Sequence, residues 1–158
     1  MWAFVGTPGK SGCIFAKKTL TMRTISNIVS KETAKLIPTT VDGRREYLER
    51  ELKKFKGRDV FCNALQTNVL ITGFSIDEIS SHASKTRKST IAALNIIESI
   101  EQCEFVKCAL PHSKREKEKF VIMYLFKVNI EDLGVAKVTI GATFVNGFIQ
   151  YCITQKEE

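Results

Sequence analysis

The spacing of apolar residues changes near residue 103, and this change limits the folds that the chain can adopt. In the longest segments before Gln102, at about 42–56, 75–83 and 89–102, apolar residues recur every three or four positions, which is typical of amphipathic helices. Beyond Gln102 the period becomes two, in strand-like runs. Asn146 and Gly147 lie between the last two runs, where they favour a two-residue hairpin turn. The sequence therefore predicts an α+β fold, in which N-terminal helices pack on a curved antiparallel sheet that ends in a three-stranded meander.

The boundaries of the expected elements follow from the residues that begin and end them. Asp42 can cap a helix that runs to about residue 56 and ends at Gly57, and a shorter helix is expected to end before Pro38. Ser75 and Glu78 have the spacing of a capping box, so the next helix is expected to begin there. The other predicted elements are short strands at 59–63 and 69–72, a helix at about 89–102 with Asn95 and Ser99 facing away from the core, a strand at 104–108, a charged loop at 109–119, and strands at 119–130, 134–144 and 148–154.

The length favours a single domain over residues 1–158, because a chain of 158 residues can bury a core without disulfide or metal support. The longest apolar run, at 120–126, is far shorter than the roughly 20 residues that cross a bilayer. The N-terminus lacks the pattern of a secretory signal. The five cysteines are scattered and include no C-x-x-C pair, which is typical of reduced, mostly buried thiols. We therefore expect a cytoplasmic protein with no membrane partner, no metal and no cofactor.

The formal net charge of +7 favours a polyanionic partner such as nucleic acid. The basic segment at 80–90, "SSHASKTRKST", contains no acid, whereas the basic groups around 53–58 and 107–119 are interpreted as solvated surface. The N-terminal "VGTPGKSG" fails the glycine spacing of a phosphate-binding loop. No G-x-S-x-G motif occurs, and the apolar surroundings of the cysteines are expected to raise thiol pKa values. A serine or cysteine hydrolase is therefore not favoured.

His82 lies in the acid-free basic segment, on the flank of the apolar face of its predicted helix. Lys85 and Arg87 follow it, and Ser89 is expected to open the next helix, whose first amide groups favour an anion. On the last strand, Thr154 points away from the apolar side chains and is a polar candidate. Such residues can supply the base, the cations and the acid that metal-independent RNA cleavage requires. The candidate catalytic residues are His82, Lys85, Arg87 and Thr154, and the candidate nucleic-acid-binding residues are Lys88, Ser89, Thr90, His112, Lys114 and Arg115.

Residues 68–155 also resemble a domain family found in the large polyvalent proteins of phages and conjugative elements. The resemblance is carried by "GFSIDEISSHASKTRKST", by "IAALNIIESIEQCEFVK", and by the strands "KFVIMYLFKVNIEDLGVAKVTIG" and "GFIQYCIT". That family is similar to the barnase, EndoU, colicin and RelE group of metal-independent ribonucleases. The resemblance implies a nuclease-like core with two helices on a curved antiparallel sheet, with His82 as a catalytic histidine and with Arg87 or Lys85 as a nearby cation. The chain reads "YCIT" where a second histidine is common in the family, and residues 1–60 lie outside the match as a helical extension.

Three hypotheses of function follow. The first is a ribonuclease-like endonuclease of a phage or mobile element, of the toxin or effector type, that cleaves RNA by attack of the 2′-hydroxyl with His82 as base or acid. Its partners would be RNA and an immunity or inhibitor protein. The second is a non-catalytic nucleic-acid-binding module that uses the same basic surface. The third is a protein-interaction module that uses a sheet edge or the helix at 43–56.

Overall fold

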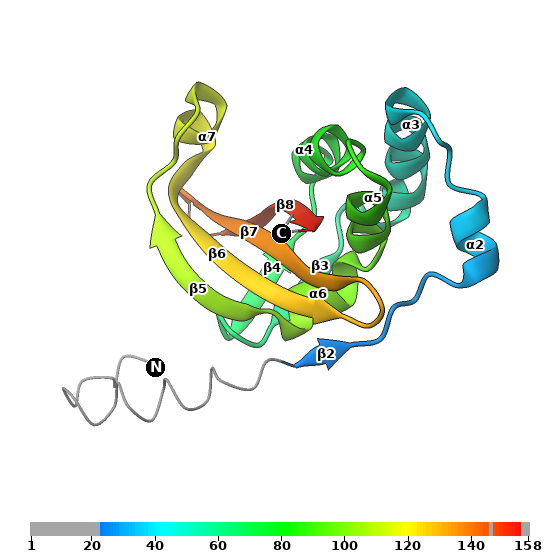
Figure 1. The fold of residues 1–158 in the computed structure, drawn as a ribbon. Helices are drawn as coiled ribbons and strands as arrows, with labels where there is room; N and C mark the ends of the chain where they lie inside the picture. Colours follow the sequence, from blue (N-terminus) through cyan, green and yellow to red (C-terminus); the bar gives the residue numbers. More distant parts are fainter. Residues whose placement is uncertain (1–22, 146, 156–158) are drawn as a thin grey trace.

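The computed structural model of the chain describes residues 23–145 and 147–155, and beyond Phe148 it describes the backbone alone. These residues form an α+β fold, as the sequence predicted (Figure 1). The segment "VGTPGKSG" lies outside the described residues. The helices are α2 (Lys31–Lys35), α3 (Val41–Leu52), the 3-10 turn η1 (Lys53–Phe55), α4 (Gly73–Ala83), α5 (Arg87–Leu94), α6 (Ile96–Gln102) and α7 (Lys114–Lys119). The strands are β2 (Thr24–Ile25), β3 (Asp59–Cys62), β4 (Thr67–Leu70), β5 (Glu104–Ala109), β6 (Phe120–Ile130), β7 (Gly134–Thr143) and β8 (Phe148–Gln155).

The strands form a mixed sheet rather than a purely antiparallel one. The sheet order is β2-β6-β7-β8-β4-β3, and β5 pairs with the same strand, β6, as β2 does. The meander β6-β7-β8 is antiparallel, as predicted. However, β4 runs parallel to β8 through the pair Leu70 and Ile149, and β2 runs parallel to β6. The prediction of an antiparallel sheet throughout is therefore wrong, because the alternation along a strand reports which face is buried and not which strand lies beside it.

The chain reverses between β7 and β8 at the expected place, but the loop is wider than a two-residue turn. Ala142 pairs with Phe148, and the Thr143 amide donates a hydrogen bond to the Gly147 carbonyl at 2.8 Å. Asn146 lies outside the described residues. The predicted Asn146–Gly147 turn is therefore corrected to a longer connection.

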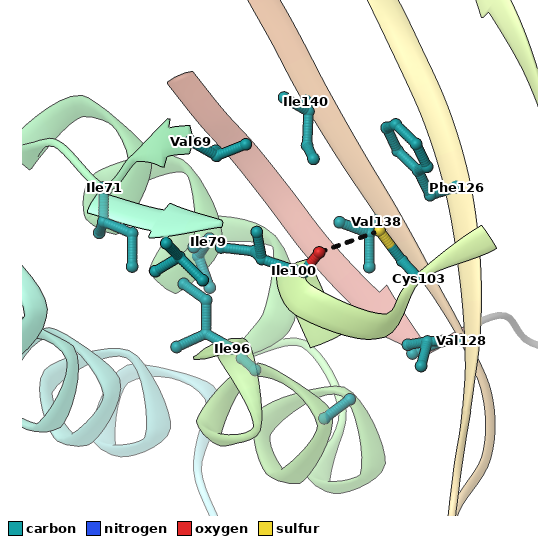
Figure 2. Packing of buried hydrophobic residues seen from close by; sticks show 14 of the residues in the cluster. Val69, Ile71, Ile79, Ile96, Ile100, Cys103, Phe126, Val128, Val138 and Ile140 are labelled. Carbon is teal, nitrogen blue, oxygen red and sulfur yellow. Dashed lines mark hydrogen bonds between the residues drawn. The ribbon is translucent and has the colours of Figure 1, made fainter. Parts of the chain in front are cut away.

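A hydrophobic core joins the helices to the sheet, and Figure 2 shows part of it. Leu48 and Leu52 of α3 are fully buried in this core, so the N-terminal segment packs with the C-terminal strands. The predicted inward residues of α4, Ile76, Ile79 and Ala83, are also buried. In Figure 1, α3, α4 and α5 lie together on one side of the sheet, and α7 stands at the start of β6. Figure 2 labels Ile79, Ile96 and Ile100 from the helices and Val69, Phe126, Val128, Val138 and Ile140 from the strands.

The helix predicted over 89–102 is in fact two helices, because the backbone leaves the helical conformation at Asn95. The Asn95 side chain is buried: its Oδ1 accepts from the Ile28 amide at 2.8 Å, and its Nδ2 donates to Asn27 Oδ1 at 3.1 Å. Ser99 is buried as well. Asn95 and Ser99 therefore lie outside the hydrophobic core cluster, as their predicted orientation implies, but both are buried, and the segment between β2 and α2 covers Asn95.

Two of the cysteines with described side chains, Cys62 and Cys103, are buried as expected, while Cys108 is exposed. Cys62 at the end of β3 and Cys103 after α6 are hydrogen-bonded to each other. This hydrogen bond lowers the pKa of Cys62 to about 7, whereas the same bond, together with burial, raises the pKa of Cys103. The expected rise in thiol pKa thus holds for Cys103 and fails for Cys62, because the sequence did not reveal that the two thiols meet.

An aromatic contact connects the sheet to the start of α4. The buried Phe120 ring lies directly over Gly141 of β7. The Phe74 ring of α4 meets Phe120 edge-on, with the ring centroids 5.9 Å apart. Because Phe120 directly follows α7 and Phe74 lies in the first turn of α4, this contact helps to set how the two helices approach each other.

We expect Gly141→Ala to destabilise the fold by about 2 kcal/mol through overpacking. A Cβ at residue 141 would lie 2.6 Å from Phe120 Cε1 and 2.7 Å from Phe120 Cγ, which is closer than van der Waals contact allows. Urea unfolding measures the difference from the unmodified protein. Gly73→Ala is the matched control, because its Cβ would meet only the flexible end of Lys56, at 3.4 Å from Cε. Equal stability changes for the two substitutions would contradict this account of the packing.

Candidate functional site

Glu78 and His82 lie one turn apart on α4 and contact each other. Glu78 Oε2 is 3.4 Å from His82 Nε2. The Glu78 side chain is only 8% exposed, whereas the His82 side chain is 45% exposed. The position of His82 on the flank of its helix is therefore confirmed, and part of its ring is accessible to a ligand.

The start of α4 explains why Glu78 is available for this contact. Thr72 is the N-cap: its hydroxyl accepts from the Ser75 amide at 3.1 Å, and the Ser75 hydroxyl accepts from the Thr72 amide at 3.2 Å. The predicted capping box between Ser75 and Glu78 is therefore wrong, and the helix begins at Gly73. Because the helix begins earlier than predicted, Glu78 lies in its second turn, with its carboxylate directed to other side chains.

Helix α7 supplies the third member of the cluster. Ser113 caps this short helix and forms a capping box with Glu116, so the predicted charged loop at 109–119 contains a helical turn. From α7, the Arg115 guanidinium forms an ion pair with Glu78 Oε1. The structure thus brings together His82 and Arg115, which come from two separate basic segments of the sequence. We refer to Glu78, His82 and Arg115 as the Glu78 cluster.

The charges in the Glu78 cluster define its chemistry. Arg115 compensates the buried carboxylate of Glu78, and its own side chain is 62% exposed, which leaves guanidinium N–H groups for an anion. A carboxylate accepts hydrogen bonds, so it favours the imidazole tautomer with the proton on Nε2 of His82. That tautomer leaves Nδ1 as a proton acceptor. The cluster therefore places a half-exposed imidazole next to a buried carboxylate and an exposed cation.

Ser89 and Thr90 are engaged in the fold rather than open to a ligand. Thr86, not Ser89, is the N-cap of α5, and its hydroxyl accepts from the Ser89 amide at 3.1 Å. The buried Thr90 hydroxyl contacts the carbonyls of Thr86 at 2.8 Å and Ala83 at 3.0 Å. The expectation that Ser89 opens the helix is corrected accordingly, because Thr86 caps α5 and both Ser89 and Thr90 are buried.

The remaining candidates lie in different places. The Arg87 guanidinium donates to the Ala34 carbonyl at 2.7 Å, and so ties α5 to the end of α2. The Thr154 backbone pairs with Lys137 of β7. Thr154 follows Phe148 by six residues along β8, so it lies about 20 Å from the end of the sheet that is nearest to α7. The backbone therefore does not bring Thr154 to α7. Lys85, Lys88, His112 and Lys114 are exposed, and the His112 amide donates to Glu116 Oε1 at 2.8 Å.

Arg44 of α3 is a structural residue of this region that the sequence reasoning missed. Its guanidinium is buried and donates to the carbonyls of Ser84 at 2.8 Å, Thr39 at 2.7 Å and Lys85 at 3.2 Å. It therefore holds the segment between α4 and α5 in place. A signal was present in the sequence, because Arg44 precedes the buried Leu48 by four residues and so lies on the apolar face of its helix.

No family model, curated protein or solved structure matches this chain. Among the described residues, no three His, Cys, Asp or Glu side chains gather closely enough to hold a metal ion. Within the same part of the chain, no helix is long and apolar enough to span a membrane.

Proposed function

We propose that the chain is a cytoplasmic RNA-binding domain that cleaves RNA without a metal ion, with His82 as the base. The observation that carries this proposal is the half-exposed imidazole of His82, which a buried carboxylate orients beside an exposed guanidinium. The net charge of +7 supports a polyanionic substrate. The domain would act as a toxin or effector of a phage or mobile element, with an immunity or inhibitor protein as a partner, as the resemblance of residues 68–155 implies.

The proposed reaction needs only the groups of the Glu78 cluster and water. His82 Nδ1 takes the proton of the 2′-hydroxyl while the 2′-oxygen attacks the phosphorus. The bond between phosphorus and the 5′-oxygen breaks, and the 5′-oxygen receives a proton from water. The hydroxide that remains takes the proton held by His82, which restores the base. The products are a 2′,3′-cyclic phosphate and a 5′-hydroxyl end. Arg115 stabilises the negative charge on the phosphoryl oxygens through its exposed N–H groups.

Incubation of the protein with a single-stranded RNA, and with DNA of the same sequence, in EDTA tests the reaction. We expect cleavage of the RNA alone, because DNA lacks the 2′-hydroxyl, and we expect products that end in 2′,3′-cyclic phosphate. Mass spectrometry identifies these ends. Intact RNA, or equal cleavage of the DNA, would contradict the proposal. RNA binding without cleavage would instead support the non-catalytic nucleic-acid-binding module.

A further inference from the structure

The start of α4 is surrounded by cations from chain segments far apart in the sequence. From α7, Arg115 Cζ lies 5.0 Å and Lys119 Nζ lies 4.6 Å from the centre of the Phe74 ring. From the other direction, Lys56 Nζ lies 3.6 Å from the position that a Cβ at Gly73 would occupy. The basic groups around 53–58 and 107–119, each interpreted from the sequence as solvated surface, therefore converge on one turn of helix.

Backbone hydrogen bonds fix Lys56 in this position. The Gly57 amide donates to the Ile71 carbonyl at 2.8 Å, and the Ile71 amide donates to the Arg58 carbonyl at 3.0 Å. Gly57 adopts a φ of +84°, which glycine adopts without steric cost. Since Ile71 directly precedes the N-cap of α4, the turn that carries Lys56 is attached to the entrance of that helix.

The cationic surface continues beyond Lys56. Lys54 Nζ lies 5.4 Å and Arg58 Cζ lies 5.9 Å from the centre of the Phe55 ring. Lys54 also forms an ion pair with Glu51 at 3.7 Å. Among the described residues, no carboxylate lies within ion-pair distance of Lys56, Arg58 or Lys119. We call the set of Lys54, Lys56, Arg58, Arg115 and Lys119 the basic band.

We propose that the basic band binds the backbone phosphates of a single-stranded RNA on one side of His82, an inference that rests on the proposed function. Gly73 and His82 are nine residues, or about 14 Å, apart along α4 and face opposite sides of the helix. Arg115 contacts both Glu78, beside His82, and the Phe74 ring, beside Gly73, so a strand that passes from His82 to the band runs by way of Arg115. The rings of Phe74 and Phe55 are covered by cations, which favours contact with phosphates rather than stacking with bases. Binding along the band is therefore independent of base sequence.

The test measures the affinity for a labelled 12-nucleotide 2′-O-methyl oligouridine, which cannot be cleaved, at several salt concentrations. For the double variant Lys56→Gln and Lys119→Gln, we expect the slope of log affinity against log salt to become shallower by about 1.4, or about 0.7 for each lost phosphate contact. The matched control is Lys31→Gln with Lys35→Gln. These residues are exposed on α2 and do not belong to the band, and their replacement changes the net charge equally. Figure 1 shows α2 and α7 on opposite sides of the molecule.

Three results would overturn the basic band. The first is an equal slope of log affinity against log salt for the band variant and the control variant. The second is that the protein does not bind the oligonucleotide at low salt. The third is that the protein binds phosphatidylserine vesicles instead of the oligonucleotide and that the band variant loses this binding. Because the probe has no 2′-hydroxyl, the result is independent of catalysis. Band-dependent binding by a protein that leaves RNA intact would contradict only the proposed cleavage. Cleavage of RNA by a protein whose band variant binds normally would contradict only the band.

Discussion

Replacing His82 by alanine is expected to lower the rate of RNA cleavage by about 10² to 10⁴-fold, the usual contribution of a general base. The affinity for the 2′-O-methyl strand should be nearly unchanged, because a neutral imidazole contributes little to phosphate binding. The fold should also be retained, since the His82 side chain is half exposed and Arg115 still compensates Glu78. Single-turnover cleavage in EDTA separates the effect on chemistry from the effect on binding.

His112→Ala is the matched control for this substitution. His112 is the other histidine of the chain, and it is exposed in the loop before α7. Its loss should leave the cleavage step intact. Glu78→Gln should lower the rate, because a glutamine amide can donate as well as accept and so no longer favours the tautomer with the proton on Nε2 of His82. Cleavage by His82→Ala at the rate of the unmodified protein would exclude His82 as the base.

The strand positions could be predicted from the sequence because burial alternates along each strand. The predicted runs at 119–130 and 134–144 correspond to β6 and β7 within one residue at each end. The parallel pairing of Leu70 with Ile149 could not be predicted in this way, since it depends on the path that the chain takes between β4 and β8. Alternation is a local property, whereas strand order is a property of the whole chain.

The Glu78 cluster was missed because two signals in the sequence compete. Thr72 with Ser75, and Ser75 with Glu78, each have a spacing of three residues, and the structure uses the first pair to start α4. Because Glu78 takes no part in the cap, its carboxylate can contact His82 and Arg115. The meeting with Arg115 also depends on α7, a helix without buried residues. Its only signal in the sequence is the capping box that Ser113 opens, which a search for apolar periodicity does not detect.

The basic segment at 80–90 is held in place by hydrogen bonds that its sequence does not reveal. Several of its backbone carbonyls, and the hydroxyl of Thr90, are bonded within the protein. Of the candidates on this segment, His82 alone joins the Glu78 cluster. The anion site predicted at the start of the next helix was based on the composition of this segment, whereas the structure of the segment is determined by Arg44 and by the cap at Thr86.

Arg44→Ala is expected to destabilise the fold by about 3 kcal/mol. The substitution removes one guanidinium but leaves three backbone carbonyls, those of Thr39, Ser84 and Lys85, without their donor. An unsatisfied buried polar group costs about 1 to 3 kcal/mol, and water can reach the two partly buried carbonyls, which reduces the total. Urea unfolding measures the loss, and hydrogen exchange should show the largest increase at the end of α4 and the start of α5.

Two further substitutions make this prediction specific. Arg45→Ala removes the neighbouring arginine, whose exposed side chain pairs only with Glu49 at 3.1 Å, and should change stability by no more than about 0.5 kcal/mol. Arg44→Lys keeps the charge but cannot direct donors at three carbonyls from one planar group, so its stability should lie between those of Arg44→Ala and the unmodified protein. If Arg44→Ala were as mild as Arg45→Ala, the segment between α4 and α5 would keep its conformation without the guanidinium.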